Sequence, residues 1–157
     1  MNRNRAIAYL LRNFDVIDDA VDHTLHQYFA QCSVLVNCRD LAAIGATLAN
    51  VGENPQTHSE VFDAICVRDA LAAMFTCGMY DYAGEWAFRV GVPAKSGVAG
   101  GIMAVVNRQM GVAVYSPRLD ARGNSVRGIK VCADLSDEFG LHAFDCTNFG
   151  SSLLRTL

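Results

Sequence analysis

Residues 76–98 read TCGMYDYAGEWAFRVGVPAKSGV, and this stretch joins a helical part of the chain to a strand-rich part. A helical pattern runs into it and ends at about Cys77, with Gly78 as a natural C-cap residue. After Trp86 the pattern changes to short runs rich in Val and Ile, which are typical of strands. The predicted strands cover residues 93–96, 101–106 and 112–116. Residues 107–109 connect the last two strands without a two-residue hairpin signal.

Helical patterns fill the chain before this stretch. The first covers residues 3–14, and the second begins at Asp18 and Asp19, where acidic side chains suit the positive end of the helix dipole. Asn37 is placed to cap a third helix. The residues expected on the apolar faces of the second and third helices are Ile17, Val21, Leu25, Tyr28, Phe29, Leu41, Ile44 and Leu48. A loop at residues 51–58 then leads into the long helix that ends the helical part.

One more helix is expected after the strands. A polar turn at residues 122–124 precedes an amphipathic pattern at 125–139. The residues expected to face inward on this helix are Val126, Ile129, Cys132, Leu135 and Phe139. Residues 142–157 have a weak pattern and are expected to form a loosely ordered tail. Helices, then hairpin strands, then a covering helix predict an α+β fold with an antiparallel sheet and not a βαβ winding.

The composition limits the class of protein. At 157 residues, one domain is expected. With 52% apolar and 18% charged residues, the chain is either a well-packed globular protein or a piece of a larger one with a surface that is normally covered. A net charge of −3 and the absence of a basic run argue against a nucleic-acid partner. No apolar run reaches the ~20 residues of a membrane helix, and no signal-peptide core is evident, so we expect a cytoplasmic protein without membrane contact.

The cysteines form no Cys-x-x-Cys pair. They are Cys32, Cys38, Cys66, Cys77, Cys132 and Cys146. An even number is compatible with disulfides, but most of these residues lie in apolar helical or strand patterns. We therefore expect reduced and mostly buried thiols.

Lys95-Ser96-Gly97 is the most informative triplet for chemistry. It lies at the edge of the predicted sheet, as a Lys-Thr-Gly strand does in serine acyl-transfer enzymes of the penicillin-recognising kind. In such a strand the Lys supplies positive charge, the hydroxyl donates a hydrogen bond, and the Gly lets substrate approach the backbone. A plain strand start is the competing interpretation, because the triplet is common. A phosphate-binding P-loop is excluded, since Arg89 and Ala94 occupy its glycine positions.

Other polar residues are weaker candidates. Tyr28 and Tyr80 could act in a pocket, although a Tyr on an apolar helical face more often belongs to a core. Asn4 reads as a surface residue on its pattern alone. His23 and His26 stand three apart on a helix, but no third ligand is evident, so we expect no metal site.

The sequence shows no serine nucleophile with its base. In a Ser-x-x-Lys motif the hydroxyl and the amine lie one helical turn apart, so that the Lys can accept the proton. No Ser of the chain is followed by Lys at the third position, and Gly-x-Ser-x-Gly is also absent. The residues therefore supply a candidate active-site strand without a matching nucleophile.

The stretch at 76–98 resembles the signature of the serine-dependent glutaminase family, whose fold is β-lactamase-like or transpeptidase-like. Four further segments are similar to the family and occur in the same order. They are Asn4–Leu10, Tyr28–Ser33, Leu48–Asn50 with Asn54-Pro55, and Ser116–Asp120 with Gly123-Asn124-Ser125. The resemblance covers nearly the whole chain and corresponds to the second half of a full glutaminase. His58 departs from it by standing where a Gly is usual.

The resemblance implies hydrolysis of L-glutamine to L-glutamate and ammonia through a serine acyl-enzyme, with no metal and no organic cofactor. By their places in matching motifs, Asn4, Tyr28, Tyr80 and Val98 fall on glutamine-binding positions. Val98 is expected to act through its backbone N–H beside the forming oxyanion, and Tyr28 to assist proton transfer. Lys95 and Ser96 are expected to support catalysis by shaping the electrostatics of the site.

The family's nucleophilic Ser and its Lys belong to the N-terminal half, so residues 1–157 are expected to be the C-terminal half of a single glutaminase domain. Three interpretations stay open. The chain is a glutaminase that supplies its half of the site, or a truncated and catalytically inactive fragment. The third is one half of a split enzyme, in which a missing N-terminal half docks onto exposed apolar surface. A homo-oligomer is also expected.

Overall fold

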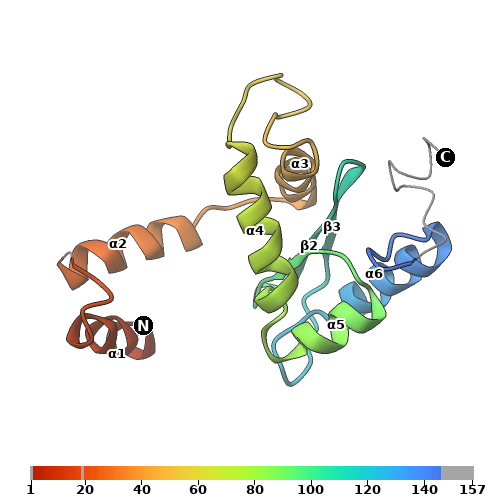
Figure 1. Ribbon diagram of the computed structural model, residues 1–157. Coiled ribbons are helices and arrows are strands. Elements are labelled where there is room, and N and C mark those ends of the chain that lie inside the picture. Colours follow the sequence, from red (N-terminus) through yellow and green to blue (C-terminus); the bar gives the residue numbers. More distant parts are fainter. Residues whose placement is uncertain (1, 19, 146–157) are drawn as a thin grey trace. The chain divides into compact units, whose positions relative to one another are not determined.

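The computed structural model describes residues 2–18 and 20–145, in two compact units, Met1–Val36 and Asn37–Leu157 (Figure 1). The first unit contains α1 (Asn2–Asn13) and α2 (Val21–Cys32). The second contains, in order, α3 (Cys38–Ala49), α4 (Ala64–Cys77), η1 (Tyr80–Tyr82), α5 (Ala83–Arg89), β1 (Ala94–Ser96), β2 (Gly101–Val106), β3 (Met110–Tyr115) and α6 (Val126–Phe139). No helix in these described ranges is long and apolar enough to span a membrane.

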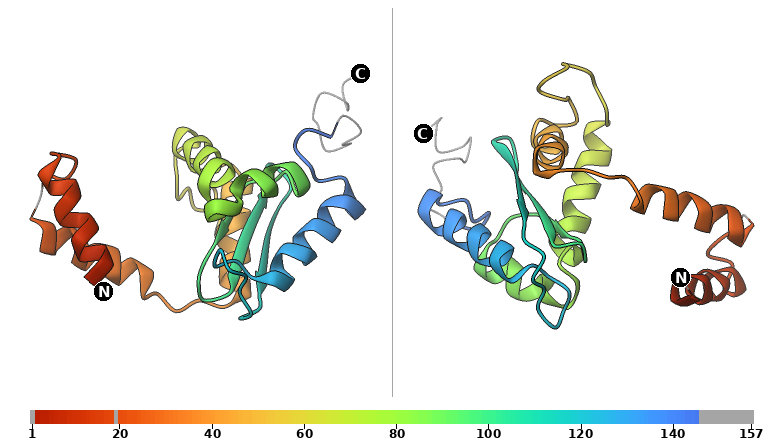
Figure 2. Two further views of the ribbon diagram at one scale, coloured as in Figure 1. Left: turned by 90° about the horizontal axis from the view of Figure 1, so that it is seen from below. Right: turned by 180° about the vertical axis from the view of Figure 1, so that it is seen from behind.

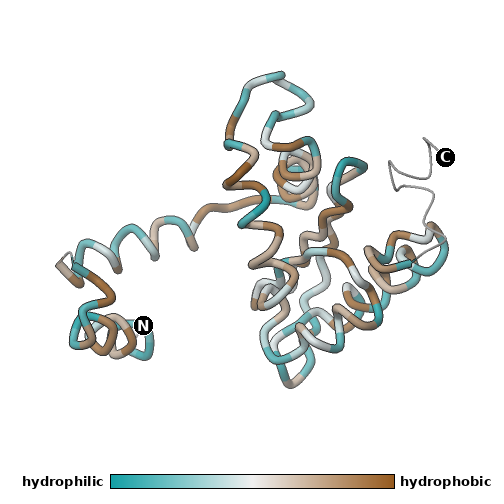
Figure 3. Tube along the Cα trace, viewed as in Figure 1, coloured by the Kyte–Doolittle hydropathy of each residue, from teal (hydrophilic) through white to brown (hydrophobic). Residues whose placement is uncertain are grey.

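The first unit has a small core. Ala8, Val21 and Leu25 are buried, and Phe29 packs against them. The helix predicted from Asp18 begins at Val21, after Ala20, which gives no side-chain cap. Apolar segments along α1 are plain in Figure 3, and the large apolar side chains of this helix are exposed.

The second unit has a well-specified first helix. The Asn37 side chain accepts hydrogen bonds from the backbone N–H groups of Arg39 and Asp40, and the Asp40 carboxylate accepts one from the Asn37 N–H. This reciprocal capping box satisfies N–H groups that have no partner within the helix. The cap predicted at Asn37 is confirmed.

The sheet is antiparallel, with strand order β1-β2-β3. Lys95 pairs with Met103, and Ser96 pairs with Ile102. Successive residues of a strand face opposite sides. The α+β arrangement with an antiparallel sheet, expected from the sequence, is confirmed.

Helices cover both faces of this sheet. On one face, Met103 and Val105 meet apolar residues of α3 and α4. On the other face, alternate β2 residues meet apolar residues of α5 and α6. These core residues are Ile102, Ala104 and Val106 of β2 with Tyr82, Ala83, Trp86 and Cys132. Figures 1 and 2 show α3 and α4 on one side of the strands and α6 on the other.

The segment between α4 and β1 is a turn of 3₁₀ helix followed by α5, and neither element was predicted. Trp86 is fully buried on α5, and its Nε1 donates to the Val92 carbonyl at 2.7 Å. Gly78 ends α4, as predicted. A Cβ at Gly78 would lie 1.8 Å from the Ala94 carbonyl oxygen, so the glycine is required for the close approach of α4 to β1.

The predicted inward faces of two helices are partly wrong. Val126 and Phe139 are exposed, and so is Ile44. Small residues form the buried line of α6 instead, namely Gly128, Cys132 and Ser136 at spacings of four. The same holds for α3, where a Cβ on Gly45 would lie 3.1 Å from the Gly111 Cα. Close backbone approach at small residues therefore sets the buried line of each helix, and Ile44, Val126 and Phe139 lie outside it.

The cysteine prediction is also partly wrong. The five described cysteines are free thiols, as expected, but Cys32, Cys38, Cys66 and Cys77 are exposed. They lie on helix faces or ends that no neighbouring element covers. Cys132 is buried among apolar residues, and this burial raises the pKa of its thiol to about 12. Cys146 lies outside the described residues.

Two loop regions that the sequence analysis singled out, at His58 and at the start of the predicted tail, are described by the structure. His58, at the position where the resemblance leads us to expect Gly, adopts φ of 55°, a left-handed conformation that glycine adopts more readily. At the start of the predicted tail, the backbone N–H of Ala143 donates to the Gly91 carbonyl at 2.9 Å. The remainder of that tail, residues 146–157, lies outside the described residues.

Candidate active site

The structure brings three of the predicted site residues together at β1. The Tyr80 hydroxyl donates to the Ser96 carbonyl oxygen at 3.1 Å. The Lys95 amine donates to the same oxygen, and it lies 4.8 Å from the centroid of the Tyr80 ring. An ammonium over an aromatic face is attracted by the electron-rich ring. Tyr80, Lys95 and Ser96 therefore form one cluster, which we call the Tyr80 cluster.

The end of α4 positions this cluster. The backbone N–H of Ser96 donates to the Gly78 carbonyl at 2.9 Å, which fixes the strand beside the turn that carries Tyr80. Tyr80 itself has φ of 54°, in the left-handed region that a bulky residue rarely adopts. Such a conformation persists only when surrounding contacts enforce it, and it is frequent at functional sites.

Ser96 contributes to the cluster through its main chain. Its side chain is buried and lies on the face of β1 opposite to the exposed Lys95. Among the described residues, no hydrogen-bond partner is found for its Oγ. The atom that meets Tyr80 and Lys95 is the Ser96 carbonyl oxygen, whereas the sequence suggested the hydroxyl.

Lys95 has a perturbed amine. Partial removal of water from around this group lowers its pKa below the ordinary 10.5, because burial disfavours the charged form. The neighbouring Cys77 acts in the opposite direction through its negative charge when ionised. A pKa lowered by burial, in a group that also contacts other polar side chains, is a feature of functional sites.

Val98 occupies a tight loop after β1. Gly97 donates its N–H to Gly101, and Gly100 donates to Gly97, both at 2.9 Å. The backbone N–H of Val98 makes no hydrogen bond within the described parts of the chain, and the residue is 71% exposed. This N–H group is therefore available to an external acceptor such as a substrate oxygen.

Asn4 and Tyr28 lie in the first unit, where they line one cavity of about 250 Å³. Most of its other lining residues are apolar, among them Ile7, Leu11 and Leu25. Tyr28 is half exposed, and its ring contacts that of Phe29 edge-on. The structure thus brings these two predicted residues to a common pocket.

A polar network beside the Tyr80 cluster was missed by the sequence reasoning. The Asn124 amide donates to the Met79 carbonyl oxygen at 3.3 Å, and the Arg122 guanidinium pairs with Glu85 at 3.1 Å. The resemblance of Gly123-Asn124-Ser125 to the family marked this segment in the sequence, but nothing in it indicated that Asn124 would contact Met79.

Within residues 2–18 and 20–145, no cluster of three His, Cys, Asp or Glu side chains is arranged to hold a metal.

Comparison with known proteins identifies the family of this chain. The sequence model of the family described as Glutaminase matches residues 1–144. The chain belongs to the glutaminase family. Curated glutaminases from Trichormus variabilis and from Nostoc are 59% identical over 145 residues and 57% identical over 150 residues, respectively. These matches cover 92% and 96% of this chain but 43% and 45% of the two relatives, so the chain spans less than half of their length.

Solved glutaminase structures share the fold. The covalent complex between the Bacillus subtilis glutaminase YbgJ and 5-oxo-L-norleucine matches with a TM-score of 0.86 and 40% identity, over 90% of this chain and 51% of that one. The probable glutaminase ybaS matches with a TM-score of 0.88 and 47% identity, over 90% and 46%. Mglu in its glutamate form matches with a TM-score of 0.86 and 44% identity, over 92% and 33%. The glutaminase fold expected from the sequence is confirmed.

Proposed function

We propose that this chain supplies the substrate-binding wall of a glutaminase site that hydrolyses L-glutamine to L-glutamate and ammonia. The observation that carries the proposal is the Tyr80 cluster, whose Ser96 lies two residues before Val98, together with the N–H of Val98, which has no hydrogen-bond partner among the described residues. Family membership supports it, as does the reaction of the related YbgJ with a diazo-ketone to give a covalent complex. The glutamate form of Mglu supports a glutamate product.

The proposed reaction proceeds through an acyl-enzyme. A serine hydroxyl attacks the side-chain carboxamide carbon of glutamine, and its proton passes to the departing nitrogen, which leaves as ammonia. Water then hydrolyses the ester, which restores the serine and releases glutamate. Negative charge develops on the carboxamide oxygen in both steps, and a preorganised backbone N–H stabilises it. We assign this donor to Val98.

The Tyr80 cluster is proposed to hold and polarise the substrate. The Lys95 amine supplies positive charge beside the Tyr80 hydroxyl, and the shared Ser96 carbonyl fixes both groups. Asn4 and Tyr28 are proposed to bind glutamine as well, and Tyr28 to assist proton transfer near the nucleophile. The cavity that these two residues line, together with the family-like segments around them, supports this assignment.

The attacking serine is proposed to come from a segment other than these 157 residues, because no Ser-x-x-Lys motif occurs in them. That segment is either part of a longer chain or a separate polypeptide that docks on this one. The same observation favours a second candidate function, a chain that folds as part of a glutaminase without turning over glutamine.

Ammonia release from L-glutamine separates these possibilities. The purified 157-residue chain alone is expected to release none. Adding the portion of the Nostoc glutaminase that this chain does not match is expected to restore release, and Tyr28→Phe to abolish it. Turnover by the chain alone would contradict the assignment of the nucleophile, and a lack of turnover in every mixture would favour the second candidate.

The remaining expectations are proposals too. We propose a cytoplasmic enzyme, since free thiols are usual in reducing compartments. We propose that it works without metal or organic cofactor, does not bind nucleic acid, and assembles as a homo-oligomer. Light scattering of the purified chain over a range of concentrations tests the last point.

A further inference from the structure

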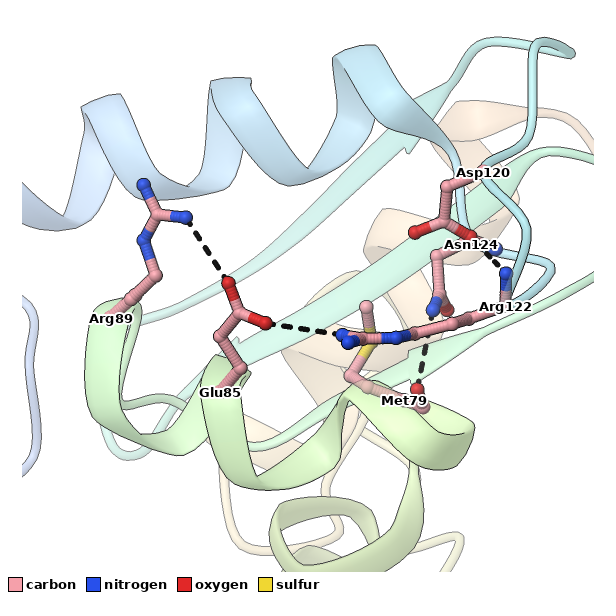
Figure 4. A network of polar contacts seen from close by, with 6 residues as sticks. All are labelled: Met79, Glu85, Arg89, Asp120, Arg122 and Asn124. Atoms are coloured by element: carbon pink, nitrogen blue, oxygen red, sulfur yellow. Dashed lines mark hydrogen bonds and ion pairs between the residues drawn. The ribbon is translucent and has the colours of Figure 1, made fainter.

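The loop that follows β3 contacts the chain on both sides of Tyr80. Asn124 contacts Met79, the residue before Tyr80, and Arg122 contacts Glu85 on the helix after it (Figure 4). Arg122 also lies over the ring of Tyr82. These contacts join positions far apart in the sequence, so they tie one loop to one short turn. We name residues 120–124 the clamp loop.

Asn124 makes the contact that precedes Tyr80. Its side chain is completely buried, and its Nδ2 donates to the Met79 carbonyl oxygen at 3.3 Å. That carbonyl belongs to the peptide bond that leads into Tyr80, where φ is 54°. Because an N–H donor on this carbonyl restricts rotation of the peptide, Asn124 helps to hold the left-handed backbone.

The Asn124 amide is only partly used for structure. Among the described residues, no hydrogen-bond partner is found for its Oδ1, although the atom is buried. A buried amide with an unsatisfied oxygen is costly, and an apolar side chain would be less so. The presence of this amide beside a strained candidate substrate-binding residue points to a role other than stability.

Arg122 makes the contacts that follow Tyr80. Its guanidinium pairs with the Glu85 carboxylate at 3.1 Å and lies 5.3 Å from the centroid of the Tyr82 ring. Glu85 also pairs with Arg89 at 3.4 Å. These ionic groups are about half exposed, so their pairing is weaker than the buried contact of Asn124.

Between them, Gly123 lies against the site itself. A Cβ there would lie 3.7 Å from Val98 Cγ1 and 4.0 Å from Tyr80 Cε2. Asp120 shapes the loop, since its Oδ1 accepts the backbone N–H groups of Arg122 and Asn124, each at 2.9 Å. The clamp loop therefore contacts the backbone before Tyr80 and the helix after it, and its Gly123 lies near the edge of the Tyr80 ring.

We propose that Asn124, with Arg122 as a weaker second anchor, is a positioning residue that holds the Tyr80 hydroxyl in the glutamine site. The effect of this positioning on glutamine turnover rests on the proposed function. Asn124 acts through the Met79–Tyr80 peptide and does not itself contact substrate. Without it, the left-handed turn relaxes and the Tyr80 hydroxyl leaves the Ser96 carbonyl oxygen.

NMR of the full chain labelled with ¹³Cζ-tyrosine tests the positioning independently of turnover. Tyr80→Phe assigns the Tyr80 resonance. In Asn124→Ala this resonance is expected to move toward its position in the urea-unfolded chain. Asn37→Ala, which removes a helix cap elsewhere in the same unit, is the matched control and is expected to leave it in place. An unmoved Tyr80 resonance in a folded Asn124→Ala chain overturns the proposal.

Arg122→Ala decides the matter if Asn124→Ala does not fold. It is expected to move the Tyr80 resonance by a smaller amount in the same direction, and Arg122→Lys to restore it. The control is Lys130→Ala, which breaks the exposed pair of Lys130 with Asp134 on α6. If Arg122→Ala and Lys130→Ala shift the Tyr80 resonance equally, the proposal is overturned.

Measurement of glutamine turnover tests whether the position of Tyr80 matters for the reaction. In an active complex of this chain with the complementary part of a glutaminase, Asn124→Ala is expected to lower kcat/KM on the order of 10-fold, since misplacement of a group that holds and polarises the substrate has effects of this size or larger. Unchanged kcat/KM with a moved Tyr80 resonance overturns the role of Asn124 in turnover. If no mixture turns over glutamine, the proposed function fails while the NMR result still decides the positioning.

Discussion

The unit at residues 1–36 and the unit at residues 37–157 use their apolar residues differently. The first buries Ala8, Val21 and Leu25 and leaves the large apolar side chains of α1 exposed. The second has apolar cores on both faces of its sheet, centred on residues such as Trp86 and Val105. The Tyr80 cluster therefore belongs to a unit with apolar cores on both faces of its sheet, whereas Asn4 and Tyr28 lie on two helices with little core between them.

Separating the two units gives the largest expected effect. Residues 37–157 expressed alone should keep a cooperative thermal transition, because both cores lie inside this segment. A peptide of residues 1–36 should be mostly unfolded in water, since two 12-residue helices with so small a core are marginal. Circular dichroism of the two pieces measures this. If the peptide of residues 1–36 had a stable helical spectrum and a cooperative thermal transition, the proposed difference in stability between the two units would be wrong.

Trp86→Ala tests the scaffold of the larger unit. Truncating this fully buried side chain should lower the free energy of unfolding by about 3–5 kcal/mol, through lost burial and an internal cavity. Phe88→Ala on the same helix is the matched control, because Phe88 is 85% exposed and its loss should have little effect. Urea denaturation of both variants gives the comparison, and similar losses would show that α5 is not part of the core.

Helix caps sharpen the comparison at a smaller scale. Asn37→Ala should destabilise the larger unit by about 1 kcal/mol, because it removes both acceptor contacts of the capping box. Ala20→Ser should instead raise the helicity of α2, which has no side-chain cap. Amide hydrogen exchange resolves the two helices separately. No gain of protection in α2 would indicate that its start is limited by something other than capping.

The smallest expected effect is the pH dependence from Lys95. Because burial lowers the pKa of its amine in the folded chain, the unfolded chain binds more protons between that lowered value and 10.5. Stability from this group therefore rises with pH through this interval and is lost as pH falls through it. Lys95→Met should remove this dependence and Lys130→Met should not. Urea denaturation in alkaline buffers measures it, and identical pH profiles for wild type and Lys95→Met would contradict the burial of the amine.

The sequence predicted most elements of the larger unit because their patterns are local. The cap at Asn37, the glycine at the end of α4 and the Val-rich strands each carry a signal within a few residues. The polar turn of the clamp loop was predicted as well, but its contacts were not, since Asn124 and Met79 are 45 positions apart and Arg122 and Glu85 are 37 apart. Such contacts depend on the packing of β1 against α4, which no local pattern encodes.

Side-chain direction was the other limit. A three-residue strand such as β1 does not reveal which of Lys95 and Ser96 faces the core, so the hydroxyl of Ser96 was given the role that its carbonyl oxygen takes. Tyr80 and Lys95 were both singled out, but only the structure places the amine over the ring. Exposed residues at helix ends, such as Phe139, matched an apolar period without reaching the sheet.

If residues 1–157 form the substrate-binding side of a glutaminase site, a single-chain hybrid that supplies the rest of the enzyme should be active. The part of the Nostoc glutaminase that this chain does not match would be fused to residues 1–157, and ammonia release from L-glutamine measured. We expect turnover that falls by at least about an order of magnitude on Tyr80→Phe, because the hydroxyl that donates to the Ser96 carbonyl is lost. A folded hybrid that releases no ammonia, or one that Tyr80→Phe leaves unaffected, would contradict the proposed role of this chain.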